Sequence, residues 1–326
     1  MNAQQTHPKR IELPTQFAVG PVNSYLFVEP EPILIDTGVA TDDSWAALRV
    51  GIEAEGLTVQ DIQKVIITHP HVDHFAQAHR FVSEANAQVW IADMGQQWLL
   101  DPYSMWQGRI DYYRNYFLPQ VGVSPEVEQM VVMYFTAVQQ GSPPVPQSNL
   151  SPFKVGDQLQ MGGLAWDVLH MPGHASTQTC FYQAETRQFL SADMLLPKTP
   201  TPVVEQPPDG KTRVKSLPIF LNSLDVVEAL DIDTVYPGHG EVFSNHRELI
   251  QKQRTRIHQR KDEAFTLVEA GYHTAFELVN IMYSSYPTQF RFAGLWMLVG
   301  YLDLLEAEER IEVATREDGV LLYTAV

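Results

Sequence analysis

The residues best suited to chemistry lie between Thr68 and His74, where the chain reads Thr-His-Pro-His-Val-Asp-His. Three histidines and an aspartate stand within six residues, so four metal-ligand side chains are neighbours. Burying so many ionisable groups together costs several kcal/mol unless a positive charge compensates them, and a divalent cation supplies that charge. A capped helix start would explain one histidine beside one aspartate, but not four such residues at this spacing. The stretch therefore predicts a metal site.

Residues of the same kind follow several other predicted strands. A β-branched run at 65–68 precedes the histidines, and apolar runs also precede Asp36, His174, Asp193 and His239. Ligand sites of α/β folds are built at the carboxyl ends of strands. We therefore expect these strand ends to meet along one edge of the fold and to bring the side chains together.

The remaining pattern is that of a mixed α/β protein. Apolar runs and turn residues predict strands at 17–28, 32–36, 65–68, 88–92, 157–161, 164–170, 180–182, 189–192 and 234–237. Helical spacing predicts helices at 42–55 and 217–230. A further helix after the histidine stretch carries Phe75, Ala78, His79 and Val82 on one face, so His79 is interpreted as a structural histidine rather than a ligand.

From residue 93 to about 147 the pattern is helical and rich in aromatic residues, and it ends at a Gly-Ser-Pro-Pro break. Aromatic residues at helical spacing usually belong to a core, but an insertion between ligand-bearing segments also suits a lid or a pocket wall. Lys198, in the segment after Asp193, is a candidate for an anionic substrate group, although a solvated lysine is the alternative. The candidate pocket residues are Trp98, Trp106, Tyr112, Tyr113, Tyr116 and Lys198.

The last part of the chain is predicted to be a small second domain, 247–326, after a main domain at 1–246. Helices at 247–271, 274–283 and 293–308 and a hairpin at 310–314 and 319–323 match a winged-helix pattern. This tail carries nine Lys/Arg against twelve Asp/Glu, a net charge of −3, which suits nucleic acid poorly. A packing or dimerisation element is the favoured interpretation, so a homodimer is one expected assembly.

Composition limits the classes of partner. The 326 residues carry a net charge of −17, which disfavours non-specific binding to nucleic acid or anionic membranes. The single cysteine, Cys180, excludes an intramolecular disulfide. No apolar run approaches the length of a membrane span, and residues 1–10 lack the apolar region of a signal peptide. A cytoplasmic location is expected.

Together these motifs resemble a known family. Thr68–His74, followed by His174, Asp193 and His239 and preceded by Asp36 in a Leu-Ile-Asp-Thr-Gly context, resemble the motifs of the metallo-β-lactamase-fold hydrolase superfamily over residues 11–245. The segment 20–26 and the helical tail look like the β-lactamase-like protein 2 branch, which carries a C-terminal winged-helix-like domain. The resemblance implies an α/β fold, an αββα sandwich with the site along one edge of the paired sheets.

Carried over to this chain, the resemblance implies two metal positions. The first ion would be held by His69, His71 and His174, and the second by Asp73, His74 and His239, with Asp193 bridging. Asp73 would also orient the attacking hydroxide and pass a proton to the leaving group. Asp36 would hydrogen-bond a ligand or the loop that carries the ligands.

The expected cofactor is a pair of divalent metal ions. Three imidazoles with an open position are a hydrolytic zinc arrangement, but imidazole and carboxylate also suit iron or manganese. Flavodiiron relatives place a carboxylate where His71 stands and carry a flavodoxin domain; this chain has neither feature, so hydrolysis is favoured.

The leading hypothesis is a dinuclear hydrolase that acts on a small ester, thioester, lactone or related acyl compound. The acidic charge and the aromatic insertion suit a small, partly apolar substrate better than a polyanion. A metal-dependent nuclease or RNA-processing enzyme of the same fold, and a mononuclear iron dioxygenase with a similar signature, stay open as alternatives. A binding protein without catalysis would need a missing ligand, and none is missing. The expected partner is a small molecule, with no nucleic acid and no membrane.

Overall fold

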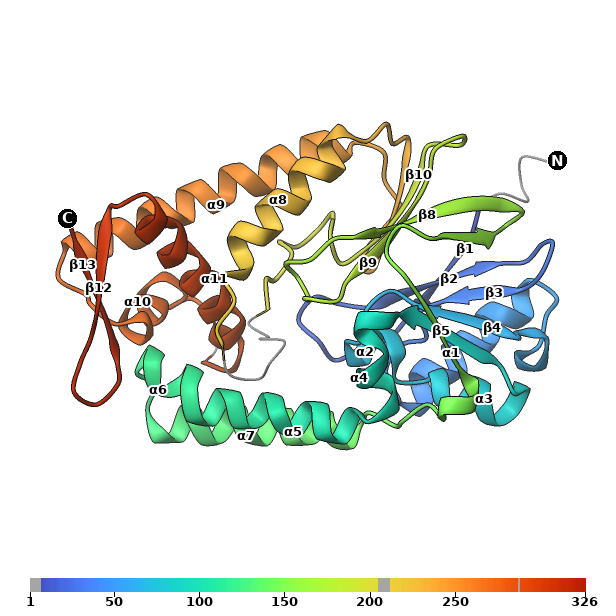
Figure 1. Cartoon of the computed structure of the whole chain (residues 1–326), viewed down its shortest axis with the longest axis horizontal. Coiled ribbons are helices and arrows are strands. Elements are labelled where there is room, and N and C mark those ends of the chain that lie inside the picture. Colours follow the sequence, from blue (N-terminus) through green and yellow to red (C-terminus); the bar gives the residue numbers. More distant parts are fainter. Residues whose placement is uncertain (1–6, 205–211, 287) are drawn as a thin grey trace.

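Two stacked β-sheets form the centre of the molecule (Figure 1), in a computed structural model that describes residues 7–204, 212–286 and 288–326. The first sheet has the strand order β1–β2–β3–β4–β5–β6, and the second has the order β11–β10–β9–β8–β7. The expected α/β class and the paired sheets with helices outside them are both present.

The first sheet is parallel over the half that carries the histidine stretch. Its strands are β1 (Lys9–Leu13), β2 (Val22–Phe27), β3 (Ile33–Ile35), β4 (Lys64–Ile67), β5 (Gln88–Ala92) and β6 (Leu150–Phe153). β3, β4, β5 and β6 pair in parallel, whereas β1 and β2 run antiparallel to their neighbours. Because β3 and β4 are parallel neighbours, Asp36 and Thr68 emerge from the same edge.

The second sheet places two further strand ends side by side. Its strands are β7 (Gln158–Met161), β8 (Leu164–His170), β9 (Thr179–Gln183), β10 (Gln188–Ala192) and β11 (Thr234–Pro237). Only β10 and β11 pair in parallel; the other pairs are antiparallel. Asp193 and His239 follow these two parallel strands, so both reach the same edge.

Apolar side chains from both sheets interlock between them. Trp166 of β8 is fully buried and meets Phe27 of β2 edge to face, with ring centroids 5.6 Å apart. Its indole N–H donates to the Met161 carbonyl at 3.0 Å, so the ring is buried without an unsatisfied donor. Each large side chain buried here contributes about 1.5–3 kcal/mol, which holds the two edges of the site in register.

Helices cover the outer faces of the two sheets. The first sheet is covered by α1 (Asp42–Ala54) and α3 (Ala78–Ala85), with the short α2 (Val72–Phe75) beside the site. The Thr41 hydroxyl caps α1 by accepting from the Ser44 N–H, and Trp45 of α1 packs edge to face on Phe81 of α3. On the side of the second sheet lie α8 (Ser216–Ala229) and α9 (His246–Glu269).

The segment between β5 and β6 is the expected helical insertion. It comprises α4 (Gln96–Leu100), α5 (Pro102–Tyr112), a π-helical turn at Tyr113–Phe117, α6 (Leu118–Val121) and α7 (Pro125–Gln140). Asp101 caps α5 by accepting from the Ser104 N–H, and Pro102 occupies the first turn, where no N–H is needed. α5 and α7 lie side by side at the lower edge of Figure 1.

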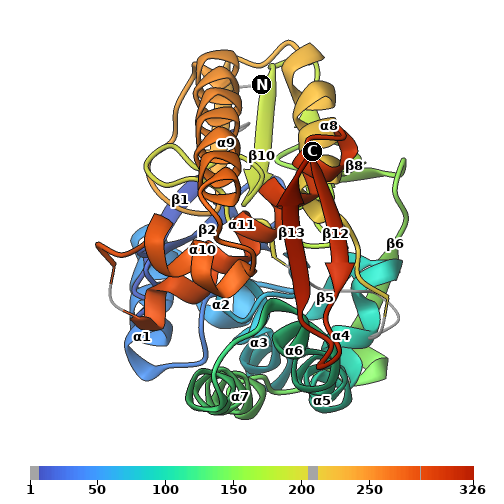
Figure 2. The same ribbon diagram turned by 90° about the vertical axis from the view of Figure 1, so that its left-hand side faces the viewer.

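The tail contains the three helices and the hairpin that its sequence predicts. After α9 come α10 (Ala275–Met282), α11 (Thr288–Ala307) and the antiparallel pair β12 (Ile311–Thr315) and β13 (Leu321–Ala325). α11 packs against α8 and α9 (Figure 2) and also reaches the insertion, where the Trp296 N–H donates to the Tyr113 hydroxyl at 2.7 Å. The tail therefore packs against both the main domain and the insertion. Its identification as a separate winged-helix domain stays a prediction.

The main differences from the predicted elements lie at the edges of the first sheet. β1 and β6 were not expected, and the strand predicted from residue 17 begins only at Val22. β6 contains Pro152, which argues against a central strand but is tolerated at an edge, and β6 is the last strand of its sheet. No helix in the described ranges is both long and apolar enough to cross a bilayer. The prediction about a signal peptide concerned residues 1–10, of which residues 1–6 lie outside the described residues.

Candidate metal centre

Three imidazoles from two segments converge at the edge between the sheets. His69 Nε2 lies 3.1 Å from His71 Nδ1, which lies 2.9 Å from His174 Nε2. Burial, with the neighbouring imidazoles, lowers the pKa of His69 and of His71 well below the ordinary value. Neutral rings whose nitrogens face one common point cannot satisfy one another by hydrogen bonding alone. Their donor set instead fits a cation with three nitrogen ligands.

A second group lies beside the first and contains a carboxylate. Ligand atoms of Asp73, His74 and His239 lie within 4.8 Å of one another, and His239 Nε2 is 3.4 Å from Asp73 Oδ2. The Nε2 atoms of His74 and His239 are buried, and neither has a hydrogen-bond partner. Orphaned buried nitrogens of this kind fit a metal ion as the missing partner.

Asp193 stands between the two groups. Its Oδ2 is 3.4 Å from His174 Nε2 and 3.5 Å from His239 Nε2, while Oδ1 is 3.5 Å from His74 Nε2. One carboxylate therefore faces ligand atoms of both groups, which is the position that a bridging ligand requires. Gly238 makes room for it, because a Cβ at that residue would lie 2.1 Å from Asp193 Oδ1.

The two groups differ in charge state. Burial alone would lower the pKa of His239, but the Asp193 and Asp73 carboxylates raise it to about 10. The pKa of His74 is likewise raised, because Asp193 and Asp36 outweigh its burial. Burial raises the pKa of Asp193, yet His239 and His74 bring it well below the ordinary value. Protons on two imidazoles thus neutralise carboxylates that a metal would neutralise when bound.

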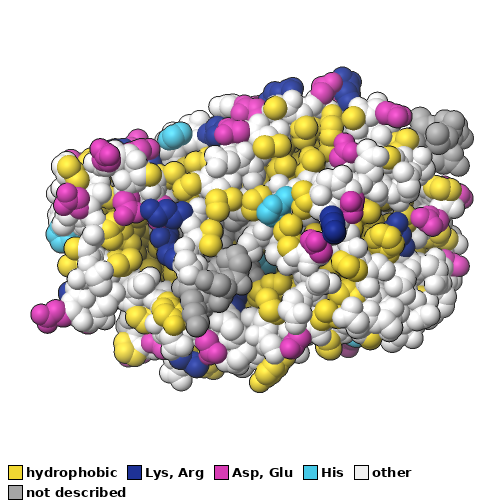
Figure 3. Space-filling view, in the orientation of Figure 1, with side chains coloured by type: hydrophobic (Ala, Val, Ile, Leu, Met, Phe, Trp, Pro, Cys, Tyr) yellow, Lys and Arg dark blue, Asp and Glu magenta, His cyan; other side chains and the backbone are white. Residues whose placement is uncertain are grey.

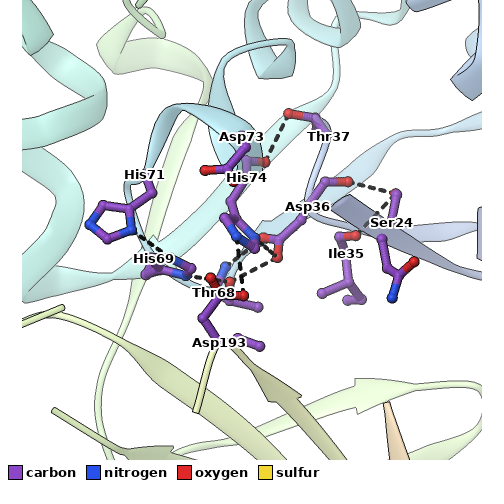
Figure 4. Close-up of polar contacts among 12 residues, drawn as sticks. Ser24, Ile35, Asp36, Thr37, Thr68, His69, His71, Asp73, His74 and Asp193 are labelled. Carbon is purple, nitrogen blue, oxygen red and sulfur yellow. Dashed lines mark hydrogen bonds and ion pairs between the residues drawn. The ribbon is translucent and has the colours of Figure 1, made fainter. Parts of the chain in front are cut away.

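Asp36 connects residues of both ligand groups through hydrogen bonds (Figure 4). Its carboxylate accepts from the Thr68 N–H at 2.9 Å and from the Thr68 hydroxyl at 2.8 Å, and its Oδ2 lies 2.8 Å from His74 Nδ1. The Thr68 hydroxyl in turn lies 3.0 Å from His69 Nδ1. Asp36 thereby orients one imidazole from each group. Its φ of 59° is a conformation that costs a non-glycine residue energy, and such strain is typical of functional sites.

Backbone carbonyls orient two more of the rings. His174 Nδ1 lies 2.7 Å from the Pro202 carbonyl, and His239 Nδ1 lies 2.8 Å from the Pro21 carbonyl. A carbonyl can only accept, so Nδ1 of each ring carries a proton. When either ring is neutral, as metal binding requires, its lone pair is on Nε2 and faces the centre.

A cavity of about 440 Å³ opens onto this centre. His71, Asp73, His174 and Asp193 lie at its base. Its walls are mostly apolar and come from residues 16–19, α5, α7 and α11. The size is that of a pocket for a small organic ligand, and the chemistry of the walls favours an apolar one.

Among the predicted pocket residues, Trp106 lines this cavity and the other five do not. Trp98 packs against Trp106, and the centroids of the two rings are 5.5 Å apart. Tyr112 and Tyr113 are buried in the insertion, Tyr116 is 40% exposed, and Lys198 is exposed and does not line the cavity. The insertion thus provides a wall, but through a different helix face from the one that its aromatic residues suggest.

The cavity also contains residues that sequence reasoning missed. Arg109 is the clearest, because it lies within the wall and is only 6% exposed. Its position three residues after Trp106 and four before Tyr113 places all three on one helix face, and this spacing could have revealed it. Trp296, contributed by α11, could not have been found in this way, because nothing in the local sequence shows that α11 reaches the insertion.

Comparison with known proteins identifies relatives for most of the chain. The family model of the metallo-beta-lactamase superfamily matches residues 18–239. A Bacillus subtilis protein described as the probable metallo-hydrolase YqjP is 30% identical over 307 residues, which cover 92% of each chain. An atrochrysone carboxyl ACP thioesterase of Aspergillus fumigatus is 24% identical over 114 residues, 35% of this chain and 33% of its own length.

A solved structure shares the whole fold. The structure of a metallo-beta-lactamase family protein from Thermus thermophilus superposes with a TM-score of 0.79 at 24% identity and covers 98% of both chains. The likeness therefore extends over the insertion and the C-terminal helices as well as the two sheets.

Proposed function

Because the chain belongs to the metallo-β-lactamase superfamily and is a metal-dependent hydrolase, we propose that it holds two metal ions and cleaves a small acyl compound. His69, His71 and His174 would bind one ion, Asp73, His74 and His239 the other, and Asp193 both. The observation that carries this proposal is the position of Asp193, whose Oδ2 faces His174 at 3.4 Å and His239 at 3.5 Å.

The ligand atoms suit hydrolytic metals, with zinc first and iron or manganese as alternatives. Bound at this place, the ions would supply a hydroxide at neutral pH and Lewis acidity at the scissile carbonyl. Asp73 lies in the cavity, and its pKa is lowered because His74 and His239 outweigh its burial. As a carboxylate it can accept a hydrogen bond from the attacking hydroxide, orient it, and later return a proton to the leaving group.

The cavity walls support a small acyl substrate. Phe17, Trp106, Phe135 and Trp296 are among the side chains that surround it, so an apolar acyl chain would lose water on entering. Since a relative is an acyl-carrier-protein thioesterase, a thioester is the first substrate class that we would test; esters and lactones come next.

The nuclease alternative receives less support. A polyanion needs a basic path, yet on the face in Figure 3 lysine and arginine side chains are scattered among acidic ones rather than gathered into a patch. A mononuclear iron dioxygenase would use one ligand group, whereas this chain presents a second group in Asp73, His74 and His239. The dinuclear hydrolase explains both groups.

The test combines metal analysis with turnover. Protein purified without chelator should contain two metals per chain and hydrolyse short acyl thioesters. Asp73→Asn should lower kcat by about 10²–10⁴-fold, while Asp43→Asn, at an exposed site in the first turn of α1, should behave as wild type. Cleavage of short RNAs but no thioester, ester or lactone would contradict the proposed substrate class, and one metal per chain would contradict the dinuclear site.

A further inference from the structure

One cation in the cavity wall has no role in the proposed hydrolysis. The Arg109 side chain is 6% exposed and lines the same cavity as Asp73 and Asp193. Within the described part of the chain its side chain forms no hydrogen bond or ion pair, and its Nε atom is buried without a partner. Leaving a charge buried and unpaired costs several kcal/mol. A protein can tolerate this cost if a ligand with an acceptor group binds beside the unpaired cation.

Aromatic rings hold the guanidinium without using its hydrogen-bond donors. Its central carbon lies 4.9 Å from the ring centroid of Phe135, 5.0 Å from Trp106, 5.7 Å from Tyr113 and 6.0 Å from Trp296. Cation–π attraction offsets part of the desolvation cost. The N–H groups of a guanidinium, however, point outward in its own plane, and a π face is a poor substitute for an oxygen acceptor. The group is therefore fixed in place and still needs an acceptor.

The cavity's own acids do not provide that acceptor. Asp193 faces His74, His174 and His239, and Asp73 faces His239. Both carboxylates thus belong to the metal centre, and neither forms an ion pair with Arg109 among the described residues. An oxyanion that enters the cavity would supply a charged acceptor for the Arg109 N–H groups in place of cavity water.

The local helix geometry supports a binding role for this position. α5 passes directly into the π-helical turn Tyr113–Phe117, and π-helical turns occur frequently at functional sites. The turn begins at Tyr113, whose ring contacts the guanidinium and whose hydroxyl accepts from Trp296. Insertion and tail are thereby locked together around the cation, so Arg109 is held rigidly enough to select a ligand.

We propose that Arg109 binds an oxyanion, with a carboxylate as the best match, at one end of an otherwise apolar acyl substrate. The planar fork of arginine pairs with a carboxylate through two parallel hydrogen bonds, and the apolar walls take the rest of the molecule. The inference rests on the proposed function, because it places the acyl carbon of the same substrate at the metal centre. It narrows the substrate class to anionic acyl compounds.

The kinetic test uses two thioesters that differ only in the far end of the acyl chain. N-acetylcysteamine thioesters of hexanoic acid and of adipic acid, the latter with a free carboxylate, are compared on the metal-loaded enzyme. Wild type should prefer the anionic thioester, and Arg109→Met should lower the anionic-to-neutral ratio of kcat/KM about 100-fold. Arg109→Lys keeps the charge but loses the fork, and should lower the ratio about 10-fold. Arg114→Met, at an exposed residue of the same helical stretch, is the matched control.

A binding test separates this inference from the hydrolase proposal. Octanoate and its neutral analogue octanamide are titrated calorimetrically into the metal-loaded wild type, Arg109→Met and Arg114→Met proteins. Octanoate should bind wild type and Arg114→Met alike, and Arg109→Met about 100-fold more weakly. Octyl sulfate distinguishes the two oxyanions: tighter binding than octanoate, again lost in Arg109→Met, would support the inference with sulfate as the group.

The outcomes decide between the two proposals. Octanoate binding that depends on Arg109, without hydrolysis of any thioester, would refute the hydrolase proposal and leave the anion site standing. Hydrolysis with an unchanged ratio and unchanged octanoate affinity in Arg109→Met would overturn the anion site alone. Equal losses for both thioesters would show a structural role and overturn it as well. If Arg109→Met does not fold, Arg109→Lys provides the test: an anionic-to-neutral ratio of kcat/KM equal to that of the wild type would overturn the anion site.

Discussion

A single methyl group added at Gly238 would intrude on the carboxylate that faces both ligand groups. The new Cβ would lie 2.1 Å from Asp193 Oδ1 and 3.0 Å from His74 Cε1. Reaching an ordinary contact distance requires a displacement of roughly 1 Å or more. The backbone of Gly238 lies outside the left-handed region, so Gly238→Ala adds this steric conflict without conformational strain.

The size of the displacement sets the expected effect. Metal–oxygen bonds tolerate deviations of only about 0.2 Å, so a carboxylate displaced by roughly 1 Å can no longer bridge two ions. We expect Gly238→Ala to fall from two metals per chain to one or fewer. Its kcat/KM for acyl thioesters should fall by at least about 100-fold.

The assay is metal analysis by mass spectrometry after passage over a chelating resin, with turnover measured on the same samples. Gly108→Ala is the matched control, because Gly108 is an exposed helical residue with open space around its Cβ position. That variant should keep both metals and gain about 0.5–1 kcal/mol of stability. Circular dichroism checks that both variants fold. A Gly238→Ala protein with two metals and normal turnover would refute the bridging role of Asp193.

Three further expectations follow from the same geometry. Asp36→Ala removes the acceptor of two bonds from Thr68 and one contact with His74, so competition with a chelator should show metal binding about 10–100-fold weaker; wild-type affinity would contradict its orienting role. Zinc added to metal-free protein at neutral pH should release on the order of three protons. Two come from His74 and His239, whose raised pKa values leave both rings protonated, and one comes from the water that becomes hydroxide. Calorimetry in buffers of different protonation enthalpy measures the number released, and the proton of His239 should no longer contribute above pH about 10; release of one proton or fewer at neutral pH would contradict the charge states. Trp296→Ala opens the cavity wall, so KM for apolar acyl thioesters should rise about 10-fold, and a change confined to kcat would argue against a wall role.

The sequence predicted which residues converge at the candidate metal centre better than it predicted which residues line the cavity, because different kinds of information specify the two. His69, His71, Asp73 and His74 are close neighbours in the chain, so their spacing alone indicates that they belong to one metal site. His174, Asp193 and His239 are distant, but each follows an apolar strand, and the parallel pairing of β10 and β11 explains how two of them meet.

The cavity wall depends on helix faces, which the local sequence does not settle. Helical spacing shows which residues share a face, but it does not show which face meets the metal centre and which meets the rest of the insertion. Tyr112 and Tyr113 pack inside the insertion, whereas Trp106 and Arg109 line the cavity. Edge strands were missed for a related reason: Pro152 breaks the strand pattern of β6 while an edge position tolerates it.

The division between sheets and helices has a mechanistic consequence. The proposed metal ligands follow strands that a buried core holds in register. The positive φ angles of Asp36 and Ala192, beside these residues, are maintained there. The walls come from α5, α7 and α11, which join through Trp296 and Tyr113. A substitution in these helices can therefore change which substrate fits without moving a ligand. Because α11 belongs to the tail and lines the cavity, we expect the tail to take part in substrate selection, and such a role would explain its packing against the insertion without any need for nucleic acid.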